Sequence, residues 1–570
     1  MHPFRCFFLF LGIFQLWSCE SSDPISLIIT NGNIATVAPQ PIPAEAIAIS
    51  EGRIVALGTN EEMLARKGPE TKLIDARGKF VMPGFIEGHG HFSMLGESMI
   101  NLNFLNTDSW EEILAMVAEK VQDLPPGVWI EGRGWHQEKW DSLPNRQWEG
   151  YPFHDELSAL TPDNPVLLKH ASGHSSFANA RAMQAAGISS ETPDPTGGAI
   201  VRDNTGRPIG VFEERAQDAI YRALRDYEAQ KDPAALHQDW LRAIELAQQE
   251  CLQKGITTFQ DAGSKFYEIE NYQHLAEQAQ LRLRLWVMVR HSYEEMKDQL
   301  DRFPILDVGN HFFSCRAIKT EVDGALGSFG AWLLRPYADK VHFVGQNTTE
   351  ISEVERIAGL AQARNMQLCI HAIGDRANRE VLDIIQTKVD QKTIPEDHRW
   401  RIEHAQHLHP RDIPRFNELG VIASMQGVHC TSDAPFVVDR LGVERAAKGA
   451  YAWRSLLDSG AQIANVTDAP VEDVDPLRSF YASVTRKRAD NGLEFFTKQK
   501  MTRAEALHSY TLGNAYAGFE EALKGSLEVG KLADIVILSN DLLTCTDEEI
   551  LTAKVLYTIV GGRIEYQAEE

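Results

Sequence analysis

Four histidines, one lysine and one aspartate form the pattern in this chain with the clearest chemistry. Each follows or ends a short apolar run: His89, His91, Lys319, His371, His404 and Asp468. Imidazole and carboxylate groups bind zinc-like divalent metals, and a site with an open coordination position can activate water. Because side chains alternate along a strand, His89 and His91 can point to one side and bind one ion. A His-x-His pair alone is weak evidence, but two further histidines at strand ends favour a metal centre.

Lys319 and Asp468 each allow two interpretations. A buried lysine amine without its proton can react with carbon dioxide, and the resulting anion can bridge two metals. The alternative for Lys319 is an unmodified amine that faces solvent or pairs with Asp323. Asp468 can ligate a metal and relay protons as the catalytic residue, or it can be a turn residue before Pro470. The first interpretation of each predicts a binuclear centre.

These residues need a scaffold that brings distant segments together. Apolar runs predict eight strands at residues 85–86, 256–259, 283–289, 315–319, 368–370, 399–402, 421–423 and 463–466. Segments with helical periodicity lie between several of them; one spans residues 350–364, and Thr502 with Glu505 forms a capping box on the last. Eight strands that alternate with helices predict an α/β protein, a (β/α)₈ TIM barrel over residues 81–524, with its ligands at the carboxyl ends of the strands.

Two regions depart from the barrel pattern. Residues 25–80 and 525–566 contain short alternating segments, which predict one composite β-sandwich built from both termini. Residues 100–225 are too long for one connection and predict an inserted subdomain after barrel strand 1, above the barrel mouth. We hypothesise that Trp135, His136, His174 and Arg454 contact substrate; the alternative is that these residues only contribute to packing.

Composition and the first residues address partners and location. The chain has 570 residues and a net charge of −24 without a basic run, which argues against nucleic-acid binding and favours a small-molecule partner. Residues 1–24 resemble a signal peptide, with an apolar stretch too short to span a bilayer. Cys19 fits a lipobox, although Trp17 is bulky there, and a plain signal peptide cut near Ser18 is the alternative. We expect an exported protein, periplasmic or a membrane-anchored bacterial lipoprotein, with membrane contact only through that lipid. Five remaining cysteines lie in apolar segments and predict buried thiols, and a homodimer is compatible with an exposed sandwich surface.

Five ordered motifs resemble the amidohydrolase superfamily, and more narrowly amidohydrolase family 3, the YtcJ-like group related to N-substituted formamide deformylases. They begin at Pro83, Lys319, His371, Glu403 and Thr467, and the segment 524–536 is similar to the family's return into its β-sandwich. Two departures stand out. Glu87 replaces a common aspartate, which affects the surroundings of the ligands, and Gly427 replaces a common proline in a pocket wall.

The resemblance implies two divalent metal ions, zinc in the usual case, and hydrolysis of a non-peptide C–N bond in an amide, formamide or cyclic amide. His89, His91 and Asp468 would hold one ion, His371 and His404 the other, and carboxylated Lys319 would bridge them. Asp468 would accept a proton from water and pass it to the leaving nitrogen. The alternatives are a mononuclear deaminase or isomerase of the same superfamily, with unmodified Lys319, and a non-catalytic surface binding lipoprotein.

Overall fold

The computed structural model describes residues 24–105 and 107–569. Apart from Pro24, the predicted leader lies outside the described residues, as does Cys19, so export and a lipid anchor stay predictions. In the part of the chain that the structure describes, no helix is both long and apolar enough to cross a membrane. The five cysteines in these ranges are free thiols. Four are buried as predicted, and Cys545 is half-buried.

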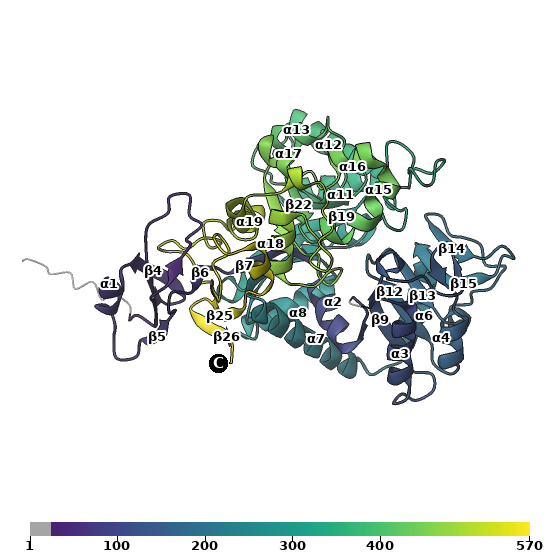
Figure 1. Cartoon of the computed structure of the whole chain (residues 1–570), viewed down its shortest axis with the longest axis horizontal. Helices are drawn as coiled ribbons and strands as arrows, with labels where there is room; N and C mark the ends of the chain where they lie inside the picture. The colour runs from purple at the N-terminus through teal and green to yellow at the C-terminus, as the bar shows by residue number, and fades with distance from the viewer. Residues whose placement is uncertain (1–23, 106, 570) are drawn as a thin grey trace, which may run out of the picture.

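Eight parallel strands form a barrel at the centre of the molecule (Figure 1). In chain order they are β7 (Phe85–Gly90), β16 (Ile256–Ser264), β17 (Arg284–Val289), β19 (Phe313–Glu321), β20 (Gln367–Ala372), β21 (Arg401–His404), β22 (Ile422–Gln426) and β23 (Ile463–Val466). The barrel closes between its last and first strands, where the Asp468 N–H donates to the His89 carbonyl over 2.9 Å and the His91 N–H donates to the Ala469 carbonyl. The predicted (β/α)₈ barrel is confirmed.

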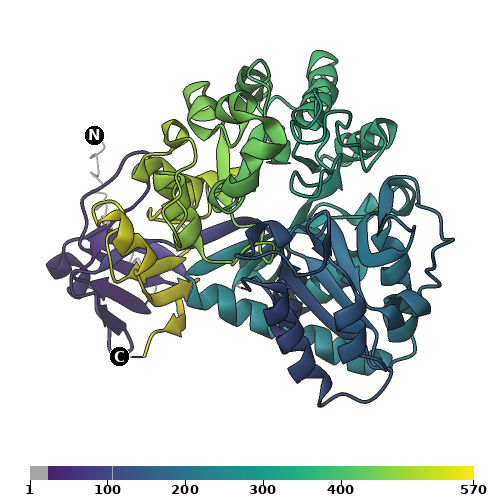
Figure 2. The ribbon, with the colours of Figure 1, turned by 45° about the vertical axis from the view of Figure 1, so that its right-hand side comes forward.

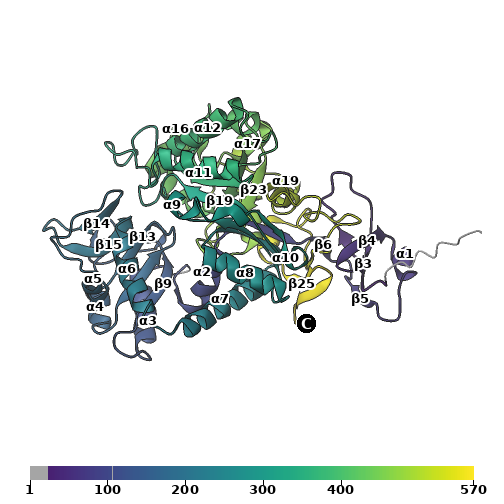
Figure 3. The same ribbon diagram turned by 180° about the vertical axis from the view of Figure 1, so that it is seen from behind.

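Helices cover the outside of the barrel and bury the faces that their apolar residues define. Seen from behind (Figure 3), α7 (Pro233–Gln253) and α8 (Phe266–Glu277) lie along the first strands. The predicted helix at 350–364 is α11 (Ile351–Ala363), which buries Val354, Ile357, Ala358 and Ala361. On α19 (Arg503–Ser509) the predicted capping box is present. α12 (Asp375–Asp390), α17 (Trp453–Asp458) and α18 (Pro476–Thr485) cover the later strands. Local helix signals therefore agree with the global fold.

Both ends of the chain contribute to the β structure beside the barrel, in purple and yellow in Figure 1. One sheet has the order β4–β3–β1–β5, from β1 (Leu27–Thr30), β3 (Ala46–Ser50), β4 (Arg53–Gly58) and β5 (Lys72–Asp75). The other has the order β2–β6–β24–β25–β26, from β2 (Asn33–Ile34), β6 (Phe80–Pro83), β24 (Ile535–Leu538), β25 (Val555–Val560) and β26 (Arg563–Gln567). Apolar residues of both sheets, among them Ile29, Ile47 and Ile535, share one buried cluster. The composite sandwich from both termini is confirmed.

The insertion after the first barrel strand contains its own sheet, which comes forward in Figure 2. Its order is β14–β15–β13–β12–β9–β8, from β8 (Leu102–Asn103), β9 (Ile130–Trp135), β12 (Val166–His170), β13 (Ser175–Ala178), β14 (Gly198–Arg202) and β15 (Pro208–Glu214). Helix α3 (Trp110–Val121) packs on the face that carries Phe177, and α6 (Gln217–Glu228) packs on the face that carries Ala178. Alternating side chains thus give this sheet two apolar faces, each with its own core.

Candidate metal centre and cavity

The predicted ligand residues meet at the carboxyl ends of the barrel strands. His89 lies in β7 and His91 directly after it, Lys319 in β19, His371 in β20 and His404 at the end of β21, and Asp468 follows β23. In a TIM barrel this is the end where active sites form, because the βα loops gather there. Five of the six residues line one cavity, namely His91, Lys319, His371, His404 and Asp468, and the sixth, His89, is fully buried beside Asp468. Residues from the first and the last barrel strands therefore share one site.

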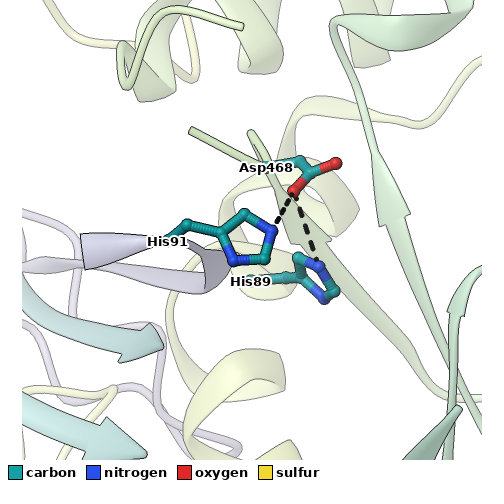
Figure 4. A group of neighbouring side chains, drawn as sticks. All are labelled: His89, His91 and Asp468. Carbon is teal, nitrogen blue, oxygen red and sulfur yellow. Dashed lines mark ion pairs between the residues drawn. The ribbon is translucent and has the colours of Figure 1, made fainter. Parts of the chain in front are cut away.

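Asp468 is the centre of the histidine group. Its Oδ1 lies 3.5 Å from Nε2 of His89 and 3.4 Å from Nε2 of His91, as Figure 4 shows. Its Oδ2 lies 3.8 Å from Nδ1 of His404. The His371 ring packs against the His404 ring, with 4.3 Å between the centroids. One carboxylate thus faces two imidazoles from the end of β7 and one from the end of β21.

Several donor atoms in this group are buried without a hydrogen-bond partner. They are Nε2 of His89, Nε2 of His371, Nδ1 of His404 and Oδ1 of Asp468. An unpaired buried polar atom costs about 1 to 3 kcal/mol, so a convergent set of them calls for a ligand. Imidazole nitrogens with one carboxylate oxygen are the donor set that zinc-like cations take. The residues present therefore fit a divalent metal.

Glu403 orients His89 from behind. A close hydrogen bond joins the Glu403 carboxylate to Nδ1 of His89, and Glu403 Oε1 lies 2.7 Å from Nε of Arg401. All three side chains are fully buried. Because a carboxylate only accepts, Nδ1 carries the imidazole proton and Nε2 presents its lone pair toward Asp468. Sequence analysis missed this support, although the buried Arg-x-Glu pair in one strand signals two charges on the same face that must find partners.

Glu87 connects the first barrel strand to the last. Its carboxylate accepts the Thr467 N–H over 2.8 Å and the Thr467 hydroxyl over 2.9 Å. Burial raises the pKa of Glu87 to about 8, and its hydrogen bonds with Thr467 partly offset that rise. The glutamate that replaces the family's common aspartate therefore holds the backbone next to Asp468 and does not itself face the cavity.

Two of the predicted ligand residues have a strained backbone. His404 has a φ of +75° and Asp468 a φ of +62°. Left-handed conformations are unfavourable for residues with a Cβ, and they persist where the surrounding structure holds them and often serve function. His404 is the last residue of β21 and Asp468 lies two residues after β23, and both line the cavity.

Burial favours the protonation states that bind a cation. It lowers the pKa of His89, His371 and His404 and brings that of His91 to about 4. Burial alone would raise the pKa of Asp468, but its interactions with the histidines outweigh this and hold it well below the usual range. Neutral imidazoles around an ionised carboxylate can bind a metal ion without first losing protons.

Lys319 is only 3% exposed, so the alternative of a solvent-facing lysine is wrong. Burial, and then the charge of Arg290, lower the pKa of its amine. Asp323, the possible ion-pair partner of Lys319, instead accepts the backbone N–H groups of Trp332, Ile373 and Gly374 at 2.8 to 2.9 Å. Asp323 therefore fixes the loops around His371.

The cavity above the centre has a volume of about 350 Å³ and is walled by the barrel loops and the inserted sheet. His136 and His174 line it, as hypothesised for substrate contacts. Trp135 and Arg454 are not among its lining residues. Trp135 is buried in the core of the insertion, where its Nε1 donates to the Leu168 carbonyl. Arg454 lies on α17 and pairs with Glu505 and Asp458.

His174 is held in the cavity wall by an acidic partner. Its Nδ1 lies 3.0 Å from Oε2 of Glu214, and its ring centroid lies 5.5 Å from that of His371. Burial acts to lower the pKa of His174, but Glu214, together with Glu321 and Asp323, raises it to about 9. At neutral pH His174 is therefore an imidazolium that can donate to an oxygen in the cavity. His136 is the opposite case, because burial lowers its pKa and its ring stacks on Phe436.

The sequence pattern missed His429, which follows β22 and also lines the cavity. Ligand atoms of His404, His429 and Asp468 lie within 4.8 Å of one another, as do those of His89, His91 and Asp468. The signal for His429 is the one that identified the other histidines: a histidine that follows a buried strand, here after a two-residue turn.

A closed (β/α)₈ barrel with a histidine and aspartate centre at its carboxyl end, beside a composite sandwich, defines a class of metal-dependent hydrolases by fold. The sequence model described as "Amidohydrolase family" matches residues 72–566, and the chain belongs to that family. It is 31% identical to the putative amidohydrolase YtcJ of Bacillus subtilis, with 94% of this chain and 98% of that protein covered. It is 28% identical to the N-substituted formamide deformylase of Arthrobacter pascens, with 95% and 98% covered.

Solved structures agree with the fold. A metal-dependent hydrolase from Pyrococcus horikoshii superposes with a TM-score of 0.72 at 26% identity, covering 91% of this chain and 99% of that one. A metal-dependent hydrolase from Pyrococcus furiosus gives a TM-score of 0.69 at 26% identity, covering 91% and 100%. The family, the barrel and a hydrolase assignment therefore rest on relatives that span nearly the whole chain.

Proposed function

We propose that this chain hydrolyses a non-peptide C–N bond of a small amide, formamide or cyclic amide with two divalent cations, zinc in the simplest case. The observation that supports this most is the set of buried, unpartnered imidazole and carboxylate atoms under a cavity of about 350 Å³. The similarity to an N-substituted formamide deformylase over 95% of the chain supports the choice of bond.

The residues divide the work by position. His89, His91 and Asp468 would hold one cation, His371 and His404 the other, with Lys319 between them as a carbamate. When bound, such ions make water more acidic and polarise a carbonyl. Asp468 is ionised and lines the cavity. It would accept the proton of the attacking water and return it to the leaving nitrogen. His174 donates to the carbonyl oxygen as negative charge develops on it.

Lys319 is suited to carboxylation because its buried amine loses its proton readily. The amine nitrogen attacks carbon dioxide, a C–N bond forms, one proton leaves, and an anionic carbamate results. A purified sample supplied with isotopically labelled bicarbonate should therefore show a carbamate resonance. The resonance should be lost when Lys319 is replaced by methionine.

The first experiment is the metal content per chain after purification without chelators, together with the intact mass under native conditions. Two ions per chain and the added mass of carbon dioxide on Lys319 are expected. One ion with an unmodified lysine would favour a mononuclear deaminase or isomerase. No bound ion would favour a non-catalytic binding protein.

His174→Ala should lower kcat on a good substrate by about 100-fold, the typical cost of removing one donor to an oxyanion. The measurement is steady-state kinetics beside His342→Ala, which alters an exposed histidine away from the cavity. Unchanged turnover in the His174 variant would remove this residue from the substrate contacts.

A further inference from the structure

His429 begins the short helix α14 (His429–Ser432), which follows β22 after a two-residue turn; β22 lies between the strands that carry His404 and precede Asp468, and its end has so far been given no role in the centre. It is 7% exposed and lines the same cavity as the other ligands. Its Nε2 is buried and has no hydrogen-bond partner. A buried imidazole nitrogen without a partner calls for an explanation, which a bound group would supply.

The turn that delivers His429 is anchored to the elements that carry Asp468. The Gly427 N–H donates to Oδ1 of Asn465 over 3.1 Å, and the Val428 N–H donates to Oγ of Ser479 over 3.1 Å. Asn465 lies in β23 and Ser479 in α18, the strand and helix on either side of Asp468. The positions of His429 and Asp468 are therefore set by one hydrogen-bonded frame.

Gly427 is required for this close packing. A Cβ at that position would lie 2.4 Å from the Ser479 carbonyl oxygen, a distance that forces the backbone to move. A proline there would also lack the N–H that Asn465 accepts. The departure from the family's common proline thus coincides with a turn that depends on its N–H and lies tightly against α18.

His404, His429 and Asp468 form a second group of metal-type donors beside the group of His89, His91 and Asp468. Their ligand atoms lie within 4.8 Å of one another, and all three residues are buried. Two donors on one tetrahedral zinc lie about 3.4 Å apart, given bond lengths near 2.1 Å. Small side-chain rotations would close this group around an ion, and the shared Asp468 would then contact two ions.

We propose that His429 is a metal ligand, binding the second divalent cation together with His404 and Asp468. The proposal rests on the proposed metal centre and adds a ligand to it. It predicts that His429 contributes to the affinity for the second ion and not to that for the first. Strand β22, which lies between β21 and β23, thereby contributes a ligand to the centre as its two neighbours do.

The test uses the full chain, stripped of metal and titrated with Zn²⁺ or Co²⁺ against a competing chelator. Wild type should show two binding events. His429→Ala should weaken one of them by at least about 100-fold, because even outer partners of metal ligands are worth roughly 10- to 100-fold in affinity. Gly427→Ala should weaken the same event, since it displaces the turn while keeping the imidazole. His407→Ala, a buried histidine that lines a separate cavity, should change neither.

A second variant gives a direct readout of coordination. His429→Cys places a thiolate at the same position, and Co²⁺ binding should then produce a sulfur-to-cobalt absorption band absent from wild type. Unchanged affinities in His429→Ala together with no such band would overturn the proposal, and the proposed function would stand as long as His89→Ala still loses binding. If wild type binds no divalent ion, both fall.

Discussion

Asp468→Asn should reduce kcat by about 10⁴-fold, the upper end of what a positioned acid or base contributes. The change keeps the shape of the side chain but removes the charge that faces His89, His91 and His404. It therefore removes the proton acceptor and weakens cation binding at the same time. Turnover on the best amide or formamide found by screening and metal content per chain are the two measurements.

The control for Asp468 is Asp473→Asn, five residues further along the same segment, where the carboxylate pairs with Lys254 and does not line the cavity. This variant should retain wild-type turnover and metal content. If Asp468→Asn kept more than a tenth of wild-type turnover, another group would have to be the base.

Glu403→Gln should lower the free energy of unfolding by about 3 to 5 kcal/mol, the usual cost of removing one partner of a buried ion pair. Arg401 would keep its hydrogen bonds to Gln260, at 2.6 Å, and to the Gly88 carbonyl, at 2.7 Å, but its charge would lose its counter-charge. Glutamine offers one acceptor oxygen where Glu403 has two, so Arg401 and His89 would compete for it, the tautomer of His89 would no longer be fixed, and metal affinity should also fall by roughly 10- to 100-fold. Urea unfolding of the metal-free chain and chelator competition measure the two effects separately.

A double variant, Arg401→Met with Glu403→Leu, distinguishes the effect of the buried charges from the effect on His89. Removing both charges should recover much of the lost stability, because an apolar replacement of a buried pair is often tolerated. It should not restore metal affinity, since leucine offers His89 no acceptor. A free energy of unfolding within about 0.5 kcal/mol of wild type for Glu403→Gln alone would contradict the assigned role.

The barrel was predictable because each strand is a short apolar run and several end on a ligand-type residue. A strand buried on both faces has a continuous apolar signature, which needs no partner information to recognise. The structure extends several strands at their ends: the expected strand at 85–86 is β7, Phe85–Gly90. There the sequence turns to glycine and histidine, and backbone pairing in the barrel overrides their weak strand propensity.

The wall of the cavity was less predictable than its floor. Trp135 and His136 are neighbours in sequence, yet one packs into the core of the insertion and the other faces the cavity. Alternation along β9 (Ile130–Trp135) separates neighbours, but only the packed fold says which face is the outer one. Arg454 was a plausible contact by charge alone, and its pairing with Glu505 depends on how two helices meet outside the barrel.

The seam of the barrel has a consequence for how the chain assembles. The backbone bonds between His89, His91 and the segment after β23 join the first and last strands, and the same residues supply the candidate ligands. Contacts between such distant parts of a chain form late, because a long loop must close before they stabilise anything. A cation that binds only the closed ring would stabilise it in proportion to the logarithm of its concentration. The metal supply during biosynthesis would then determine the fraction of molecules whose barrel stays closed, in addition to the fraction that is active.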